Sequence, residues 1–121
     1  VTLERDLYVL MAEVATLPAN RHKLIDGSSK VTPEMVARLE TLIDELAAEY
    51  EMPTEFVVPG ENQLSAALDV ARTTIRRAER FAVGYPLEDS HVVAYLNRLS
   101  DLAWTMARWA EGPHHRPAKQ K

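Results

Sequence analysis

Four arginines stand within ten residues of a chain that is otherwise acidic. The decapeptide ARTTIRRAER, residues 71–80, holds these four arginines and one glutamate, whereas the whole chain has a formal net charge of −4. Arg72, Arg76 and Arg80 recur at every fourth position, so on a helix they lie along one strip. Like charges at that spacing destabilise a helix by roughly 0.2–0.5 kcal/mol per pair. Because guanidinium groups match phosphate oxygens bidentately, this arginine strip favours a site for a small phosphate-bearing anion.

Two other interpretations of the arginine strip stay open. Asp69 with Arg72, or Arg76 with Glu79, would form ordinary salt bridges on the flank of a helix. Such pairs usually alternate in sign, whereas this strip has more arginine than the neighbouring carboxylates neutralise. Alternatively, a structural bundle would use the strip to dock an acidic partner or a nucleic acid. Nucleic-acid binders usually spread basic residues over a face, and here the positive charge is local, so we expect no nucleic-acid partner.

A second stripe of polar and aromatic residues lies in a later segment. Asn97, Asp101, Trp104 and Arg108 recur at intervals of four and three residues. This spacing places them on one side of a helix. We expect the two stripes to lie beside the buried faces of two helices, as a cationic edge and a mixed edge that carries a large aromatic ring.

Hydrophobic spacing predicts four helices and no strand. The helices are expected at residues 3–17, 33 to about 52, about 62 to 84, and 90 or 91 to 111, with Thr32 as an N-cap and Pro33 in the first turn. Asp89 or Ser90 is expected to cap the fourth. Apolar residues recur in alternating steps of four and three, which is typical of antiparallel helices packed at about 20°. The predicted fold class is therefore all-α, an up-down helical bundle. The inner seam of the third helix is predicted to be Leu64, Leu68, Ala71, Ile75, Ala78 and Ala82.

The composition excludes several kinds of protein and several kinds of site. The chain has 121 residues, enough for one domain, and no cysteine, which excludes disulfides and thiolate chemistry. No apolar run is long enough to span a membrane and no signal peptide opens the chain, so we expect no membrane partner and a cytoplasmic location. Glu88 and His91 form a single Glu-x-x-His, whereas a di-iron bundle needs two such pairs, so no metal ligands are predicted.

The two polar segments together resemble a known family. FVVPG and LSAALDVARTTIRRAER, followed by YLNRLSDLAWTMARWA, closely resemble the ATP:cob(I)alamin adenosyltransferases of the PduO type. DLYVLMAEVAT also looks like the family's second helix. The resemblance implies a trimeric helical bundle with active sites between subunits, which makes adenosylcobalamin and triphosphate from ATP and cob(I)alamin. It implies ATP, Mg²⁺ and the substrate cobalamin as ligands, and a reductase or a B12-dependent mutase as a partner.

The resemblance also assigns roles to individual residues. ATP would contact Arg76, Arg77, Glu79, Arg80 and Asn97. The corrinoid would contact Phe56, Asp69, Asp101 and Trp104, with the aromatic pair lining the face below cobalt. The residues implied in catalysis are Arg72, Arg76 and Phe56, of which Arg72 corresponds to an arginine that pairs with an aspartate on the family's first helix.

The sequence departs from the family pattern in several places. Glu61 stands where the family usually has a second glycine after the proline, Asp69 stands where histidine is frequent, and Asp101-Leu-Ala-Trp104 replaces a DYFF-like run. The chain starts at Val1 inside a predicted helix, so we expect a fifth, N-terminal helix and its ATP-wrapping segment to be missing. Residues 1–111 are expected to form the adenosyltransferase domain, and residues 112–121 a disordered basic tail. The alternative is a non-catalytic corrinoid-binding or structural trimer that has lost its ATP site.

Overall fold

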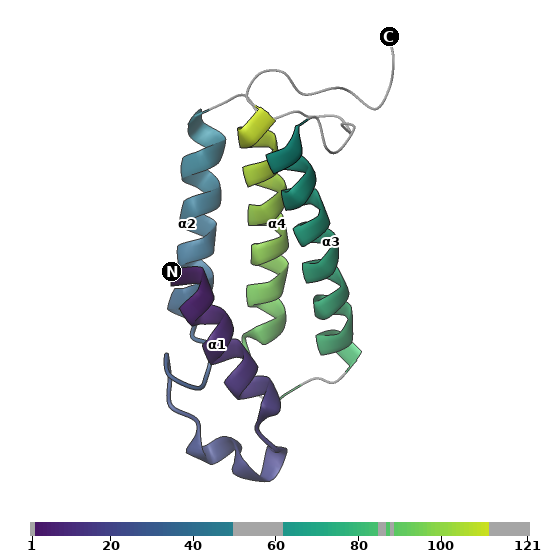
Figure 1. Cartoon of the computed structure of the whole chain (residues 1–121). Coiled ribbons are helices and arrows are strands. Elements are labelled where there is room, and N and C mark those ends of the chain that lie inside the picture. The colour runs from purple at the N-terminus through teal and green to yellow at the C-terminus, as the bar shows by residue number, and fades with distance from the viewer. Residues whose placement is uncertain (1, 50–61, 85–86, 88, 112–121) are drawn as a thin grey trace.

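The molecule is a bundle of helices. The computed structural model of the chain describes residues 2–49, 62–84, 87 and 89–111, and no strand is found among them. Its elements are α1 (Thr2–Ala15), the 3₁₀-helix η1 (Pro18–Lys23), α2 (Pro33–Glu49), α3 (Gln63–Gly84) and α4 (Val92–Glu111). Helix α4 lies between α2 and α3, with α2 and α4 running in the same direction and α3 running opposite to both, and α1 crosses their lower half obliquely (Figure 1). The prediction of an all-α, up-down bundle is confirmed. Within the described ranges, none of the helices combines the length and apolar character needed to cross a bilayer.

Side-chain caps fix where three of the helices begin. The backbone N–H of Met35 donates to Thr32 Oγ1 at 3.2 Å, so Thr32 caps α2 as predicted. At α3, Ser65 N–H donates to Asn62 Oδ1 at 2.8 Å and Asn62 N–H donates back to Ser65 Oγ at 3.0 Å. This reciprocal pair resembles a capping box. Val92 N–H donates to Ser90 Oγ at 3.2 Å, which selects Ser90 as the cap of α4.

Helix α1 ends earlier than the apolar pattern predicts. It stops at Ala15, Leu17 is extended, and Pro18 opens the 3₁₀-helix η1 where a loop was expected. The residue before a proline is sterically disfavoured in the helical region, so the helix cannot continue through Leu17. The predicted end of the second helix near residue 52 and the predicted tail at 112–121 lie outside the described residues.

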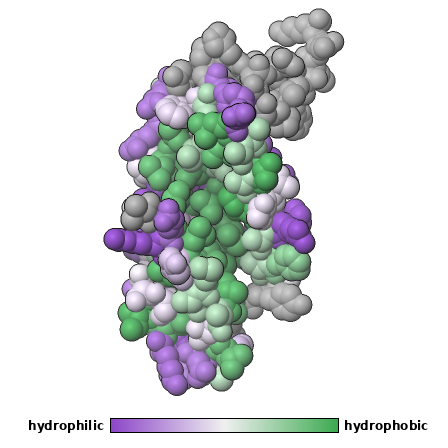
Figure 2. Space-filling view, in the orientation of Figure 1, coloured by the Kyte–Doolittle hydropathy of each residue, from purple (hydrophilic) through white to green (hydrophobic). Residues whose placement is uncertain are grey.

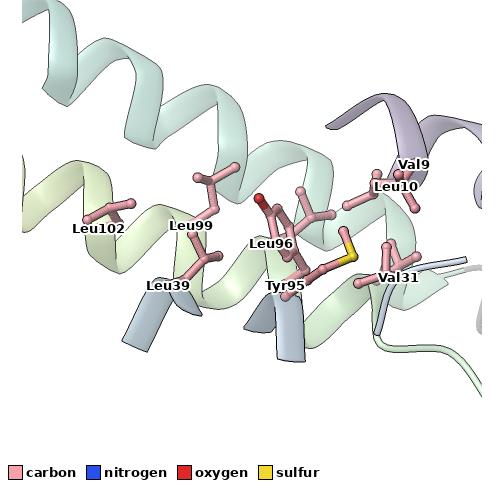
Figure 3. Packing of buried hydrophobic residues seen from close by; sticks show 10 residues of the cluster. Val9, Leu10, Val31, Leu39, Tyr95, Leu96, Leu99 and Leu102 are labelled. Carbon is pink, nitrogen blue, oxygen red and sulfur yellow. The ribbon is translucent and has the colours of Figure 1, made fainter. Parts of the chain in front are cut away.

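The hydrophobic core is centred on α4, which lies between α2 and α3 (Figure 1). The apolar spacing predicts six seam residues for α4, of which four are buried and two, Met106 and Ala110, are half-buried; the buried ones are Val92, Leu96, Leu99 and Ala103. Tyr95 and Leu102 are buried as well, because a helix covered on more than one side buries more than one stripe. Figure 3 shows four α4 side chains, Tyr95, Leu96, Leu99 and Leu102, beside apolar residues of the other elements. The labelled partners are Val9 and Leu10 of α1, Val31, and Leu39 of α2.

The predicted seam of α3 is only partly correct. Leu68, Ile75 and Ala82 are half-buried, whereas the other three predicted residues are exposed. Those exposed residues are Leu64, Ala71 and Ala78. The reason is the place of α3 at the edge of the bundle, where α4 is its main neighbour among the described helices. A helix with one neighbour buries a narrow stripe and leaves the rest of its apolar face uncovered.

Two buried carboxylates hold α1 in place. Glu13, with 0% of its surface exposed, accepts hydrogen bonds from Val31 N–H (2.8 Å), the Ser90 hydroxyl (2.6 Å) and Arg21 Nη2 (3.1 Å). Asp6 accepts from the Tyr95 hydroxyl at 3.1 Å and from an arginine of α2 at 3.3 Å. Burial, and then the negative charge of Asp6, raise the pKa of the Tyr95 phenol well above its usual value. Hydrogen bonds to Glu13 and Asp6 thus tie α1 to η1, α2 and α4.

Candidate functional site

The two polar stripes predicted from the sequence meet along the margin between α3 and α4. Asn97 Nδ2 donates to Glu79 Oε2 at 3.1 Å, which ties two of the predicted ATP-binding residues together across the helices. Asn97 Oδ1 accepts from Arg98 Nη2 at 2.6 Å, and the same guanidinium group lies 2.6 Å from Asp101 Oδ2. A continuous polar chain therefore runs from Glu79 to Asp101, from the predicted nucleotide residues to a predicted corrinoid residue.

The four arginines of α3 are available for a ligand. Arg76, Arg77 and Arg80 are exposed and Arg72 is half-buried. Among the described residues, none of the four forms an ion pair or hydrogen bond with the chain. The salt-bridge interpretation required two pairs along α3, but neither of these pairs forms. Glu79 and Asp69 instead bond to α4, and within the described ranges α3 presents guanidinium groups without counter-charge.

A second cluster lies at the other end of the same margin, around Arg108. Its Nη2 atom is 2.7 Å from Asp69 Oδ2 on α3, and its Nε atom is 2.8 Å from Glu111 Oε1 one turn further along α4. The guanidinium carbon lies 5.3 Å from the centroid of the Trp104 ring, within cation–π distance. Arg108 is 3% exposed. Asp69 and Trp104, both predicted at the corrinoid side, are thus brought together by one buried arginine.

Some predicted site residues cannot be placed. Phe56 lies outside the described residues, so its expected place beside the corrinoid, with Trp104, stays a prediction. Asp101 keeps 49% of its side chain exposed while it pairs with Arg98. In the part of the chain that the structure describes, no group of three or more His, Asp or Glu side chains is arranged to hold a metal ion.

An apolar cavity of about 660 Å³ opens between α1, α3 and the start of α4. It begins where the arginine segment ends, because Ala78, Phe81 and Ala82 of α3 line one wall. Phe81 is 64% exposed, and Val14 on the α1 wall is 53% exposed. Figure 2 shows that apolar residues gather over the face on which α1 lies. The remaining lining residues are Leu10, Leu87, Ser90, Val92, Val93 and Leu96.

Two organising residues of the margin were missed as site residues from the sequence. Arg98 stands three residues before Asp101, and Arg108 stands four after Trp104 and three before Glu111. These are intervals at which side chains on a helix touch. That spacing was the available signal, but it does not reveal which arginine is buried.

Comparison with known proteins gives consistent matches. The family model described as cobalamin adenosyltransferase matches residues 1–110. The corrinoid adenosyltransferase of Citrobacter freundii is 39% identical over 112 residues, which cover 90% of this chain and 62% of that protein. The corrinoid adenosyltransferase of Bacillus subtilis is 44% identical over 113 residues, covering 82% and 57% respectively. The chain therefore spans about three fifths of the length of these relatives.

Solved structures give the same fold. A variant of the PduO-type ATP:co(I)rrinoid adenosyltransferase from Lactobacillus reuteri, complexed with ATP, superposes with a TM-score of 0.64 at 24% identity. The superposition covers 98% of this chain and 83% of that one. At this identity the likeness shows the fold alone.

Proposed function

This chain belongs to the cobalamin adenosyltransferase family, and we propose that it transfers the 5′-deoxyadenosyl group of ATP to cob(I)alamin, giving adenosylcobalamin and triphosphate. The observation that supports this function most is the set of four arginines on α3 that have no counter-charge among the described residues. Guanidinium groups kept without a protein partner are suited to phosphate oxygens, which they bind through paired hydrogen bonds.

In the proposed reaction, cobalt(I) attacks the 5′ carbon of ATP. A cobalt–carbon bond forms, the carbon–oxygen bond breaks, and its electron pair leaves on the triphosphate. Cobalt(I) is itself a strong nucleophile, so no activating base is needed. Arg72 and Arg76 are assigned to stabilise the growing negative charge, because fixed positive groups do so with little reorganisation. Mg²⁺ accompanies ATP in this proposal, but no described residue is assigned to hold it.

The neighbouring polar residues suit the nucleoside part of ATP. Arg77 and Arg80 extend the positive surface along α3, whereas Glu79 and Asn97 offer an acceptor and an amide. An acceptor and an amide match sugar hydroxyls and base edges better than they match phosphate oxygens. We assign all four, with Arg76, to ATP.

The corrinoid is assigned to the residues that follow the margin toward the other end of α4. Trp104 is half-buried and Asp69 lies in the same cluster, with Asp101 one turn before Trp104. Phe56 and Trp104 would form apolar walls below cobalt. Reduction of cobalt(II) is easier without a ligand on its lower face, and apolar bulk excludes one by keeping water out.

The assembly and setting are part of the same proposal. We assign a homotrimer, in which the exposed apolar residues of α1 and α3 meet a further helix or a second subunit. Tyr8, Met11 and Val70 are each more than half exposed, which supports such a cover. Residues 1–111 are assigned to the catalytic domain and residues 112–121 to a basic tail. The protein is assigned to the cytoplasm. Its assigned partner there is a reductase or a B12-dependent mutase.

The test is a turnover assay on the purified protein with its native N-terminus. ATP and chemically reduced cobalamin should give the light-sensitive adenosyl product, followed by its absorbance. Arg76→Ala should lower kcat/KM for ATP about tenfold, the expected loss of one charge-assisted hydrogen bond, and leave the KM for cobalamin within about twofold. Arg5→Ala, an exposed arginine on α1, is the matched control and should change neither constant.

Three results would contradict the proposal in different ways. Cobalamin binding without turnover would support a non-catalytic corrinoid-binding trimer instead. Turnover with an ATP constant insensitive to Arg76→Ala would refute the assignment of the arginine strip. Absence of both ATP and cobalamin binding would leave a structural bundle that docks an acidic partner.

A further inference from the structure

We propose that Arg108 is a positioning residue, which holds Trp104 and Asp69 in register across the α3–α4 margin so that they can receive the corrinoid. This inference rests on the proposed function and adds a residue to its site. Arg108 does not itself reach a substrate, because it is 3% exposed and its partners enclose it.

Arg108 contacts two carboxylates and one aromatic ring. Its Nε atom donates to Glu111 at 2.8 Å and its Nη2 atom donates to Asp69 at 2.7 Å. The guanidinium carbon also lies over the Trp104 ring, 5.3 Å from the ring centroid. Two carboxylates therefore hold the guanidinium group in place, and the group in turn lies over the Trp104 ring.

Burial makes this arrangement rigid. The side chain of Glu111 is 0% exposed and that of Asp69 is 14% exposed, so neither carboxylate exchanges its arginine partner freely for water. Trp104 is less buried and keeps part of its surface accessible. A half-buried ring held from behind by a planar cation can present a constant apolar face to a ligand.

Lysine cannot reproduce these contacts. Its ammonium is a point charge without a planar face, so it can pair with one carboxylate but cannot hold two and stack on an indole together. Arg108→Lys thus keeps the charge while it removes the geometry. The substitution separates positioning from simple neutralisation of the two carboxylates.

The first experiment measures how accessible the Trp104 ring is to a quencher in solution. The chain has two tryptophans and four tyrosines, so Trp109→Phe leaves Trp104 as the sole tryptophan, whose emission is selected by exciting beyond the absorption of tyrosine. In that background Arg108→Lys should raise acrylamide quenching of Trp104 about twofold, since the ring loses its stacking partner. Arg21→Lys is the matched control, because Arg21 is also largely buried and pairs with Glu13 at 3.1 Å, but lies on η1. It should leave the quenching unchanged.

The second experiment compares the effect of Arg108→Lys on the KM for cobalamin with its effect on the KM for ATP. Arg108→Lys should raise the KM for cobalamin about tenfold, as expected when a binding wall is misplaced, and leave the KM for ATP within about twofold. Should this variant fail to fold, Glu111→Gln removes one carboxylate, keeps the Asp69 pair, and should shift the cobalamin constant about threefold in the same direction. Arg21→Lys should alter neither constant.

The outcomes distinguish this inference from the proposed function. If the unmodified protein gives no adenosyl product, the proposed function fails, while the quenching comparison still reports whether Arg108 holds Trp104. If turnover is normal and both variants leave the quenching or the cobalamin constant unchanged, the positioning role is wrong. An equal rise in both Michaelis constants would also overturn it, because it would indicate a general loss of structure.

Discussion

The buried carboxylate of Glu13 offers the sharpest test of how the bundle is held together. Glu13→Gln keeps the shape of the side chain but replaces one acceptor oxygen with an NH₂ group and removes the charge. In the native protein the two oxygens receive Val31 N–H at 2.8 Å, the Ser90 hydroxyl at 2.6 Å and Arg21 at 3.1 Å. The amide cannot satisfy all three donors, and the guanidinium group loses its counter-charge.

The expected loss of unfolding free energy follows from the burial of the Glu13–Arg21 ion pair. Removing one partner of a buried ion pair costs roughly 3–5 kcal/mol. The lower end applies here, about 3 kcal/mol, because Arg21 is 14% exposed and can regain some water. For a chain of this length 1 kcal/mol corresponds to about 4 °C in Tm, so the substitution should lower Tm by about 12 °C.

The assay is urea unfolding followed by circular dichroism, at a fixed protein concentration because assembly also contributes to stability. Glu40→Gln, an exposed glutamate on α2, is the matched control and should change the unfolding free energy by less than about 0.5 kcal/mol. A Glu13→Gln change as small as that of the control would refute the assignment of Glu13 as the anchor of α1.

Two further predictions concern the corrinoid side and the pH dependence of stability. Phe56→Ala should slow product formation from cobalt(II)alamin while sparing the reaction from pre-reduced cobalt(I), measured in parallel; equal losses in the two assays would remove Phe56 from the site. The raised pKa of Tyr95 means that the folded state keeps a proton that the unfolded state releases, so stability is lost as the pH rises above about 10. Tyr95→Phe should abolish this contribution, which reaches at most about 1.4 kcal/mol per pH unit. If the unfolding free energy of both proteins falls equally steeply with pH above about 10, the prediction is contradicted.

Sequence periodicity was sufficient for the existence of the four α-helices, and local residue types were sufficient for the caps of α2 and α4. The starts at Thr32 and Ser90 depend on local side-chain hydrogen bonds, which follow from nearest neighbours in the chain. The seam of α3 was predicted less well, because the same apolar spacing at Ala71 and Ala78 does not tell how many neighbours cover a helix. That information comes from packing between distant segments.

In the candidate site, too, the residue types were predictable from the sequence, whereas the contacts between distant segments were not. The residue types of the arginine strip indicated a phosphate-binding surface, and the structure adds that Arg76 and Arg80 have no carboxylate partner in the described part of the chain. The spacing did not indicate that Asp69 would pair with Arg108, 39 positions away, instead of with Arg72 in the next turn. Long-range charge pairing depends on which helix faces are brought together, and local spacing alone cannot choose between such partners.

The central claim is that the arginines of α3 receive the triphosphate of ATP. A crystal structure of the full-length protein with ATP and cobalamin measures this directly. We predict triphosphate oxygens within hydrogen-bond distance of the Arg76 and Arg80 guanidinium groups. Bound ATP whose phosphates lie against another face, with α3 left in solvent, would contradict the account.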